Sequence, residues 1–270
     1  MNFLGCTARR LQIRRNDVAE VPQAGAEVGA AGPGGYLRAM NITTVGLDAD
    51  DTLWHNETLF RLTHDRFCAL LADVADQATL EAQLAEVEKR NLRLYGYGVK
   101  GFTLSMIETA MELTGGEAPP RVVREILAAG REMLSEPVEP LPGVDQALAE
   151  LSERYRLVLI TKGDLLHQEQ KLAASGLGDL FAAVEIVSEK DAATYDRVFA
   201  RHGSGAAQAA MCGNSMRSDI LPALEAGAWA AHVPYPLTWA HEMADAPVGH
   251  ARFVELESIR AFPGWLASIA

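Results

Sequence analysis

The stretch Asn41–Trp54, N-I-T-T-V-G-L-D-A-D-D-T-L-W, decides the fold. Its β-branched and apolar beginning, residues 42–47, predicts a buried strand. Three carboxylates follow within four positions: Asp48, Asp50 and Asp51. Like charges this close weaken a folded state unless a cation or a shared proton compensates. The stretch therefore predicts a site for a hard metal ion at the carboxyl end of a strand, where open α/β sheets bind their ligands.

Length, composition and charge limit the class of protein. A chain of 270 residues is long enough for one large core or two smaller ones. The net charge of -12 argues against nonspecific binding to nucleic acid or to an anionic membrane. A phosphate substrate is still compatible with this charge, because a metal ion and one lysine reverse the sign locally.

Cysteine usage predicts a reducing compartment. The three cysteines, Cys6, Cys68 and Cys212, are far apart and form no C-x-x-C pair. No apolar run approaches the length of a membrane span. We therefore expect a cytoplasmic protein without disulfides.

Residues 1–39 differ in composition from the rest of the chain. Basic pairs are followed by an alanine- and glycine-rich stretch, residues 24–35, which buries too little surface to fold. No continuous apolar segment follows the arginines, so a targeting peptide is disfavoured. We expect a disordered extension, and Met40 offers an alternative start. An N-terminal peptide beginning at Met1 in the native protein would contradict that alternative.

The segment 57–137 has helical spacing. Apolar residues recur every three or four positions and predict a bundle of about four helices. A glycine-rich break, residues 95–101, interrupts the pattern, and Pro137, Pro140 and Pro142 form a stiff linker after it. We expect this segment to be a separate helical domain inserted into the chain.

Strands and helices alternate after the linker. Four further strands are predicted at 156–161, 184–187, 208–212 and 229–233. With the first strand they predict an α/β domain, residues 40–56 and 138–270, that has a parallel five-stranded sheet with helices on both faces.

Polar motifs follow four of the five strands in chain order: Asp48-x-Asp50-x-Thr52, Thr161, Lys190, and Asn214 with Asp219 in G-N-S-M-R-S-D. This arrangement resembles the haloacid dehalogenase (HAD) superfamily, which is dominated by Mg²⁺-dependent phosphatases. The resemblance covers residues 40 to about 240. It implies a Rossmann-like core with strand order 5-4-1-2-3, and it implies that the helical insertion is a C1-type cap.

The residues suggest a two-step phosphate hydrolysis. Asp48 is the candidate nucleophile, forming an aspartyl-phosphate. Asp50 is the candidate acid and base, a role for which we expect a raised pKa. Thr52 is expected to hold Asp50 by a hydrogen bond. The Thr161 hydroxyl and the Lys190 ammonium are expected to bind phosphoryl oxygens.

Mg²⁺ is the expected cofactor. Its predicted ligands are the Asp48 carboxylate, the Asp50 backbone carbonyl and oxygens of Asn214 and Asp219. Asn214 stands where the superfamily more often has an aspartate, which removes one negative charge from the site. Asp219 is either a direct ligand or a partner of Lys190.

Other residues have open roles. Tyr97 and Lys100 lie in the glycine-rich break, which is either a helix connector or a substrate-binding loop of the cap. Asp51 is expected to face solvent or to cap a helix. Lys162 competes with Lys190 for the role of phosphate-binding lysine, and position favours Lys190.

Four functions follow from these residues. The first is a phosphatase for a small phosphorylated metabolite. The alternatives are a haloacid dehalogenase, which usually lacks the second aspartate, a phosphomutase, and a ligand-binding domain with a weakened metal site. No nucleic-acid or membrane partner is expected, and the oligomeric state is open.

Overall fold

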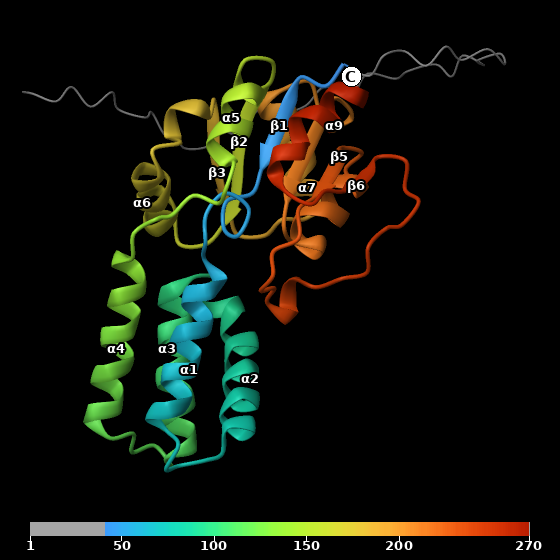
Figure 1. The fold of residues 1–270 in the computed structure, drawn as a ribbon. Coiled ribbons are helices and arrows are strands. Elements are labelled where there is room, and N and C mark those ends of the chain that lie inside the picture. Colours follow the sequence, from blue (N-terminus) through green and yellow to red (C-terminus); the bar gives the residue numbers. More distant parts are fainter. Residues whose placement is uncertain (1–40, 270) are drawn as a thin grey trace, which may run out of the picture. The chain divides into compact units, whose positions relative to one another are not determined.

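The computed structural model describes residues 41–269. The expected extension, residues 1–39, lies outside them. The core is a parallel sheet of strand order β3-β2-β1-β4-β5-β6 (Figure 1). Its strands are β1 (Thr44–Leu47), β2 (Arg156–Lys162), β3 (Ala183–Val187), β4 (Ala209–Gly213), β5 (Trp229–His232) and β6 (Phe253–Glu255). The first five have the predicted order. The prediction of five strands was wrong, because β6 is only three residues long and carries no recognisable alternation.

The first strand lies at the centre of the sheet. Leu47 is in register with Leu159 of β2 on one side and with Cys212 of β4 on the other. Every residue of β1 is buried, as in a strand covered on both faces. Packing here leaves no room for a side chain at Gly46, where an added Cβ would lie 2.9 Å from Ile160 Cδ1. Asp48 thus directly follows a fully buried and closely packed strand.

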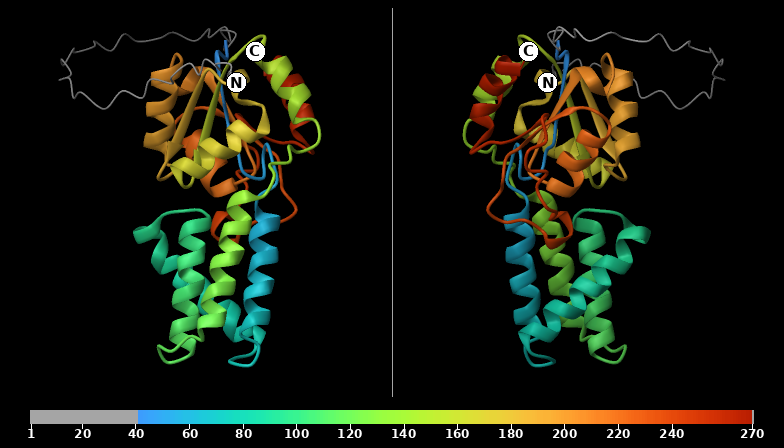
Figure 2. Two further views of the ribbon diagram at one scale, coloured as in Figure 1. Left: turned by 90° about the vertical axis from the view of Figure 1, so that its left-hand side faces the viewer. Right: turned by 90° about the vertical axis from the view of Figure 1, so that its right-hand side faces the viewer.

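Helices cover both faces of the sheet (Figure 2). On one face, α5 (Val144–Ser152) and α9 (Phe262–Ile269) contribute Leu148 and Phe262 to an apolar cluster with β1. On the other, α7 (Ala192–His202) and α8 (Leu221–Glu225) contribute Phe199 and Ala223. The remaining core helix, α6 (Leu165–Ser175), follows β2 and begins at the N-cap Asp164. This is the layered packing predicted from the alternating pattern.

The segment after β1 forms four helices: α1 (Glu57–Leu70), α2 (Gln77–Tyr95), α3 (Val99–Leu113) and α4 (Pro120–Ser135). Asp76 caps α2 by accepting the N–H of Thr79 at 2.8 Å, and Pro120 begins α4. The four helices enclose an apolar core of their own, which includes Phe67, Leu84, Met106 and Ile126. None of the helices within residues 41–269 is both long and apolar enough to cross a membrane.

Candidate active site

The end of β1 places Asp48 in the fold. Its backbone N–H donates to Cys212 O at 3.0 Å, so the strand ladder continues up to this residue. The chain then turns, with Asp51 in the left-handed region at a φ of 61°. The Asp51 carboxylate accepts the N–H groups of Asn56 and Glu57 at 2.9 and 3.0 Å. Asp51 is 6% exposed, so the expectation that it faces solvent was wrong; its carboxylate binds the N–H groups at the start of α1, whose N-cap residue is Asn56.

Asp48 is held between an ammonium and a hydroxyl. Lys190 Nζ donates to Asp48 Oδ1, and Thr52 Oγ1 donates to Asp48 Oδ2 at 2.9 Å. Burial and the nearby charge of Asp219 raise the pKa of Asp48 to about 7, against the opposing effect of Lys190. A cation bound to the same carboxylate would favour its ionised form.

Asp219 is the second partner of Lys190. Its Oδ1 accepts from Lys190 Nζ at 2.7 Å, and its Oδ2 accepts the N–H of Ser215 at 2.9 Å. The side chain is fully buried and lies in a π-helical turn, Met216–Ile220. Both of its carboxylate oxygens are therefore occupied by protein donors.

Thr52 connects Asp48 to Asn214 and does not contact Asp50. Its Oγ1 lies 2.9 Å from Asp48 Oδ2 and 3.1 Å from Asn214 Oδ1, and it accepts the Asn214 N–H. The prediction that Thr52 holds Asp50 was wrong, because the turn after β1 directs Thr52 toward β4. The Thr52 hydroxyl has one proton and can donate it to Asp48 Oδ2 or to Asn214 Oδ1, so one of these two oxygens lacks this donor.

These oxygens fit a hard cation. Carboxylate and amide oxygens are the ligand types that Mg²⁺ prefers, and Asp48 and Asn214 present one of each on either side of a single hydroxyl. Among residues 41–269, no group of three or more His, Cys, Asp or Glu side chains converges as a metal site. The predicted Mg²⁺ ligands include the Asn214 amide oxygen and the Asp50 backbone carbonyl, which are not His, Cys, Asp or Glu side chains. The absence of such a group is therefore compatible with the predicted ligands.

Asp50 is paired with a lysine that sequence inspection missed. Lys171 Nζ donates to its Oδ1 at 2.5 Å, Trp54 Nε1 donates to the same oxygen at 2.7 Å, and Gln168 Nε2 donates to Oδ2 at 3.2 Å. Burial raises the pKa of Asp50, but Lys171 and the hydrogen bonds outweigh it and lower the pKa overall. The expectation of a raised pKa was wrong for this structure. A pattern signal existed, because Gln168 and Lys171 are three residues apart on one helix face.

Gln168 also connects Asp50 to Thr161. Its Nε2 donates to Thr161 Oγ1 at 2.7 Å, and Thr161 is 1% exposed at the end of β2. Lys190 is 7% exposed, against an expectation that lysines lie at the surface. The structure thus brings together at one edge of the sheet Asp48, Asp50, Thr52, Thr161, Lys190, Asn214 and Asp219.

Lys162 is hydrogen-bonded to Glu242 and Ser218. Its Nζ donates to Glu242 Oε1 at 2.7 Å and to Ser218 Oγ at 2.8 Å, and it lies 4.1 Å from the centroid of the Tyr97 ring. Position had favoured Lys190 over Lys162. Lys190, and not Lys162, donates to Asp48.

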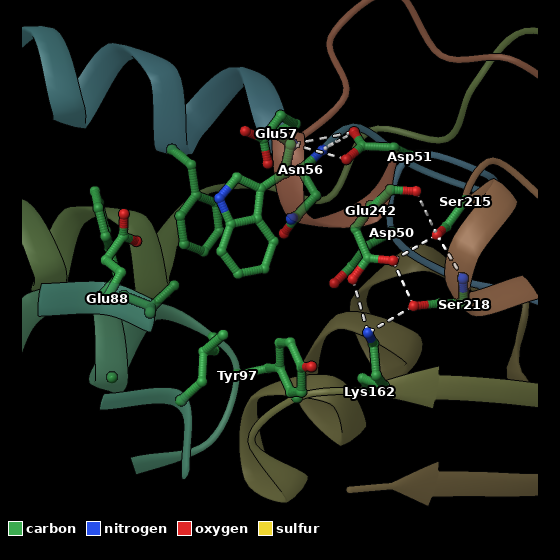
Figure 3. A pocket seen from close by; sticks show the side chains of 18 of the residues that line it. Asp50, Asp51, Asn56, Glu57, Glu88, Tyr97, Lys162, Ser215, Ser218 and Glu242 are labelled. Atoms are coloured by element: carbon green, nitrogen blue, oxygen red, sulfur yellow. Dashed lines mark hydrogen bonds and ion pairs between the residues drawn. The ribbon is translucent and has the colours of Figure 1, made fainter. Parts of the chain in front are cut away.

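Glu242 lies outside the four sequence motifs and still contacts the site. Besides Lys162, the hydroxyls of Ser215 and Ser218 donate to its carboxylate (Figure 3). Burial raises its pKa, but the Lys162 charge and these donors outweigh that effect and lower the pKa to about 2. Glu242 follows β5 in a segment without periodicity, so no sequence signal pointed to it. It fixes the turn that carries Asp219.

The glycine-rich break between α2 and α3 contacts the core. Tyr97 donates its hydroxyl to Glu189 Oε1 at 2.9 Å and lines the cavity above the sheet edge. Lys100 pairs with Asp164 at 2.9 Å, is 51% exposed, and is not among the residues that line the cavity. Of the two residues of this break with an expected role in substrate binding, only Tyr97 lines the cavity.

A cavity of about 590 Å³ unites these groups. Asp48, Asp50 and Lys190 line it from the sheet, and residues of α1, α2 and α3 line it from the inserted helices. Figure 3 shows Glu57 and Glu88 of those helices across the cavity from the Lys162 and Glu242 cluster. A phosphate group fills only part of this volume, which leaves space for a larger organic group.

Comparison with known proteins gives a consistent family. Residues 42–227 match the family model of haloacid dehalogenase-like hydrolases. A haloacid dehalogenase-like family hydrolase from Xanthomonas campestris is 40% identical, with a TM-score of 0.76 over 85% of this chain and 96% of that chain. No curated protein sequence matches the chain.

More distant solved structures share the fold alone. The HAD hydrolase YfnB from Bacillus subtilis, bound to magnesium, is 16% identical, with a TM-score of 0.57 over 84% of this chain and 99% of that chain. L-2-haloacid dehalogenase from Xanthobacter autotrophicus, with chloropropionic acid covalently bound, is also 16% identical, with a TM-score of 0.59 over 85% and 100%.

Proposed function

The chain belongs to the haloacid dehalogenase-like hydrolase family, and from this premise we propose that it hydrolyses phosphate monoesters of small metabolites. The observation that carries the proposal is the pairing of two carboxylates with different partners in one cavity. Asp48 contacts Lys190, and Asp50, two residues later, contacts Lys171. Phosphate transfer requires a nucleophile, positive charge and a separate proton carrier, and these residues supply all three.

In the first step, an Asp48 carboxylate oxygen attacks phosphorus and the bond from phosphorus to the ester oxygen breaks. The leaving oxygen takes a proton from Asp50. Lys190 and the Thr161 hydroxyl bind the phosphoryl oxygens and offset the charge that develops on them. The product alcohol leaves, and the phosphoryl group remains on Asp48.

In the second step, Asp50, now ionised, takes a proton from water. The resulting hydroxide attacks phosphorus, and the bond from phosphorus to the Asp48 oxygen breaks. This step regenerates the Asp48 carboxylate and releases inorganic phosphate. The Asp50–Lys171 pair supports this step, because it favours the ionised carboxylate that the base role needs.

Mg²⁺ is the cofactor we assign to this reaction. Asp48, the Asp50 carbonyl and Asn214 would hold it, and when bound it supplies charge neutralisation for the phosphoryl oxygens. Asp219 was expected to be either a metal ligand or a partner of Lys190. Because both of its carboxylate oxygens already accept hydrogen bonds from the protein, we assign it the second role, in which it keeps Lys190 in place.

A dehalogenase is the principal alternative, because a solved dehalogenase shares the fold. That chemistry displaces halide from carbon and needs no proton donor. Asp50, which lines the cavity and is held by three side chains, favours the phosphatase. A phosphomutase would use the same residues and exclude water, and a ligand-binding domain would release no phosphate.

A panel of phosphate monoesters tests the proposal, assayed with Mg²⁺ and with chelator. We expect Mg²⁺-dependent phosphate release that Asp48→Asn reduces by at least about 10³-fold, a loss of about 4 kcal/mol in transition-state stabilisation. Asp73→Asn, an exposed position in the α1–α2 turn, is the matched control and should retain full activity. Chloride release from a 2-chloro acid without phosphate release would establish the dehalogenase instead.

A further inference from the structure

The cavity carries an excess of negative charge. Nine carboxylates line it, against four lysine or arginine side chains. Each of these cations already has a carboxylate partner: Lys190 with Asp48 and Asp219, Lys171 with Asp50, Lys162 with Glu242, and Arg61 with Asp65. A phosphate ester adds more negative charge, and one Mg²⁺ offsets only part of it. The carboxylates of the cavity that are not paired with these four cations could therefore bind a positively charged part of the substrate.

Glu57 of α1 and Glu88 of α2 are the carboxylates without partners. Both line the cavity, and neither side chain accepts a hydrogen bond or pairs with a cation within residues 41–269. In Figure 3 no dashed line reaches either carboxylate, although Asp51, Lys162 and Glu242 are all connected. Burial raises the pKa of both groups to about 7. Partly buried carboxylates of this kind are stabilised when a ligand supplies a hydrogen-bond donor or a positive charge.

Asn91 provides an independent indication on the same wall. It is 2% exposed and lines the cavity. Its Nδ2 donates to Ser105 Oγ at 3.2 Å and to Glu108 Oε2 at 2.9 Å, which fixes the orientation of the amide. Its Oδ1 accepts no hydrogen bond from the described part of the chain. This amide oxygen of a cavity-lining residue thus has no donor from the protein, as the two glutamates have none.

Aromatic side chains also line the cavity. Phe60 and Phe102 line it as a contacting pair with ring centroids 5.1 Å apart, and Trp239 lines it from the loop after β5. Aromatic faces attract cations through the negative charge above the ring. Carboxylates, an amide oxygen and aromatic rings together are a typical environment for an organic ammonium group.

We propose that the substrate is a phosphate monoester whose far end carries an ammonium group, bound by Glu57, Glu88 and the Oδ1 of Asn91. The phosphate lies at Asp48, and the ammonium end extends toward α1 and α2. This inference rests on the proposed phosphatase function and specifies its substrate class.

Two series of synthetic substrates test it: ω-aminoalkyl phosphates and ω-hydroxyalkyl phosphates of matched chain length. We expect at least about a tenfold higher kcat/KM for the amino member at the chain length that reaches Glu57 and Glu88, which corresponds to about 1.4 kcal/mol. Glu57→Gln and Glu88→Gln should each reduce the ratio of kcat/KM for the aminoalkyl phosphate to kcat/KM for the hydroxyalkyl phosphate. Glu86→Gln, exposed on the same helix as Glu88, should keep the wild-type ratio.

The possible failures are distinguishable. Equal kcat/KM for the two series at every chain length would overturn the ammonium site while the phosphatase function stands. No phosphate release from either series, or from p-nitrophenyl phosphate, would overturn both. Because the substrate comparison is made on the wild-type protein, it does not depend on the variants folding.

Discussion

Asp48 and Asp50 are two residues apart and have opposite electrostatic environments. Burial and Asp219 raise the pKa of Asp48 to about 7, while Lys171 and neighbouring donors lower that of Asp50. At neutral pH and without ligands, these shifts favour partial protonation of Asp48, the proposed nucleophile, and ionisation of Asp50, the proposed acid. A cation bound to Asp48 would favour the ionised form of that carboxylate, and a phosphate close to Asp50 would favour the protonated form of that one. The proposed mechanism thus makes the active protonation states depend on ligand binding.

Lys171→Met tests the electrostatic control of Asp50. The first step needs protonated Asp50, so kcat/KM falls as pH rises through the pKa of Asp50 in the free enzyme. Removing the ammonium leaves burial as the main influence and raises this pKa. We expect the fall in a pH profile measured with an alkyl phosphate to move upward by about 1–3 pH units.

Lys171→Arg is the control for this experiment, because it keeps the positive charge and should keep the wild-type profile. If the methionine and arginine variants had the same profile, Lys171 would have no influence on the proton carried by Asp50.

Among the elements, the β4 strand and the turn after it depend on close packing. A Cβ at Gly213 would lie 2.3 Å from Asp219 Oδ2. Only glycine allows Asp219 to approach the strand and accept from Lys190 and Ser215. Glu242 then holds the same turn from outside through Ser215 and Ser218. The position of Lys190, the proposed phosphate-binding lysine, therefore depends on Gly213 and on the loop that carries Glu242, neither of which has a role in the proposed chemistry.

Gly213→Ala should displace Asp219 and release Lys190. We expect phosphatase activity to fall at least about a hundredfold, because one partner of a buried charged group moves away. The free energy of unfolding should decrease by about 1–3 kcal/mol, as in overpacked cores, when measured by chemical denaturation.

Gly178→Ala is the matched control, since its added Cβ would meet only Leu172 Cγ at 3.9 Å. Wild-type activity in the Gly213→Ala variant would show that Asp219 does not need its observed position.

At the scale of the whole molecule, much of the fold follows from local patterns. The apolar runs that became β1 to β5 and the helical spacing of α1 to α4 are visible in the sequence, because burial imposes these periods. Four motifs at strand ends identified the residues that meet at the sheet edge, since parallel strands end on the same side.

Contacts made by unpatterned segments could not be predicted in this way. Glu242 lies on an irregular loop, and the partner of Thr52 depends on the direction of a turn. The pairing of Asp50 with Lys171 joins residues 121 positions apart, and only the packed fold brings them together. The lowered pKa of Asp50 follows from that pairing, which is why the sequence led to the opposite expectation.

The central claim is that Asp48 carries the phosphoryl group between two chemical steps. Acid quenching of the wild-type protein during turnover of p-nitrophenyl phosphate with Mg²⁺, followed by peptide mass spectrometry, tests it most directly. We predict a phosphoryl group on the peptide that contains Asp48, located on this residue and absent from Asp48→Asn. A phosphoryl group on another residue, or turnover without labelling of Asp48 under any quench condition, would contradict the account.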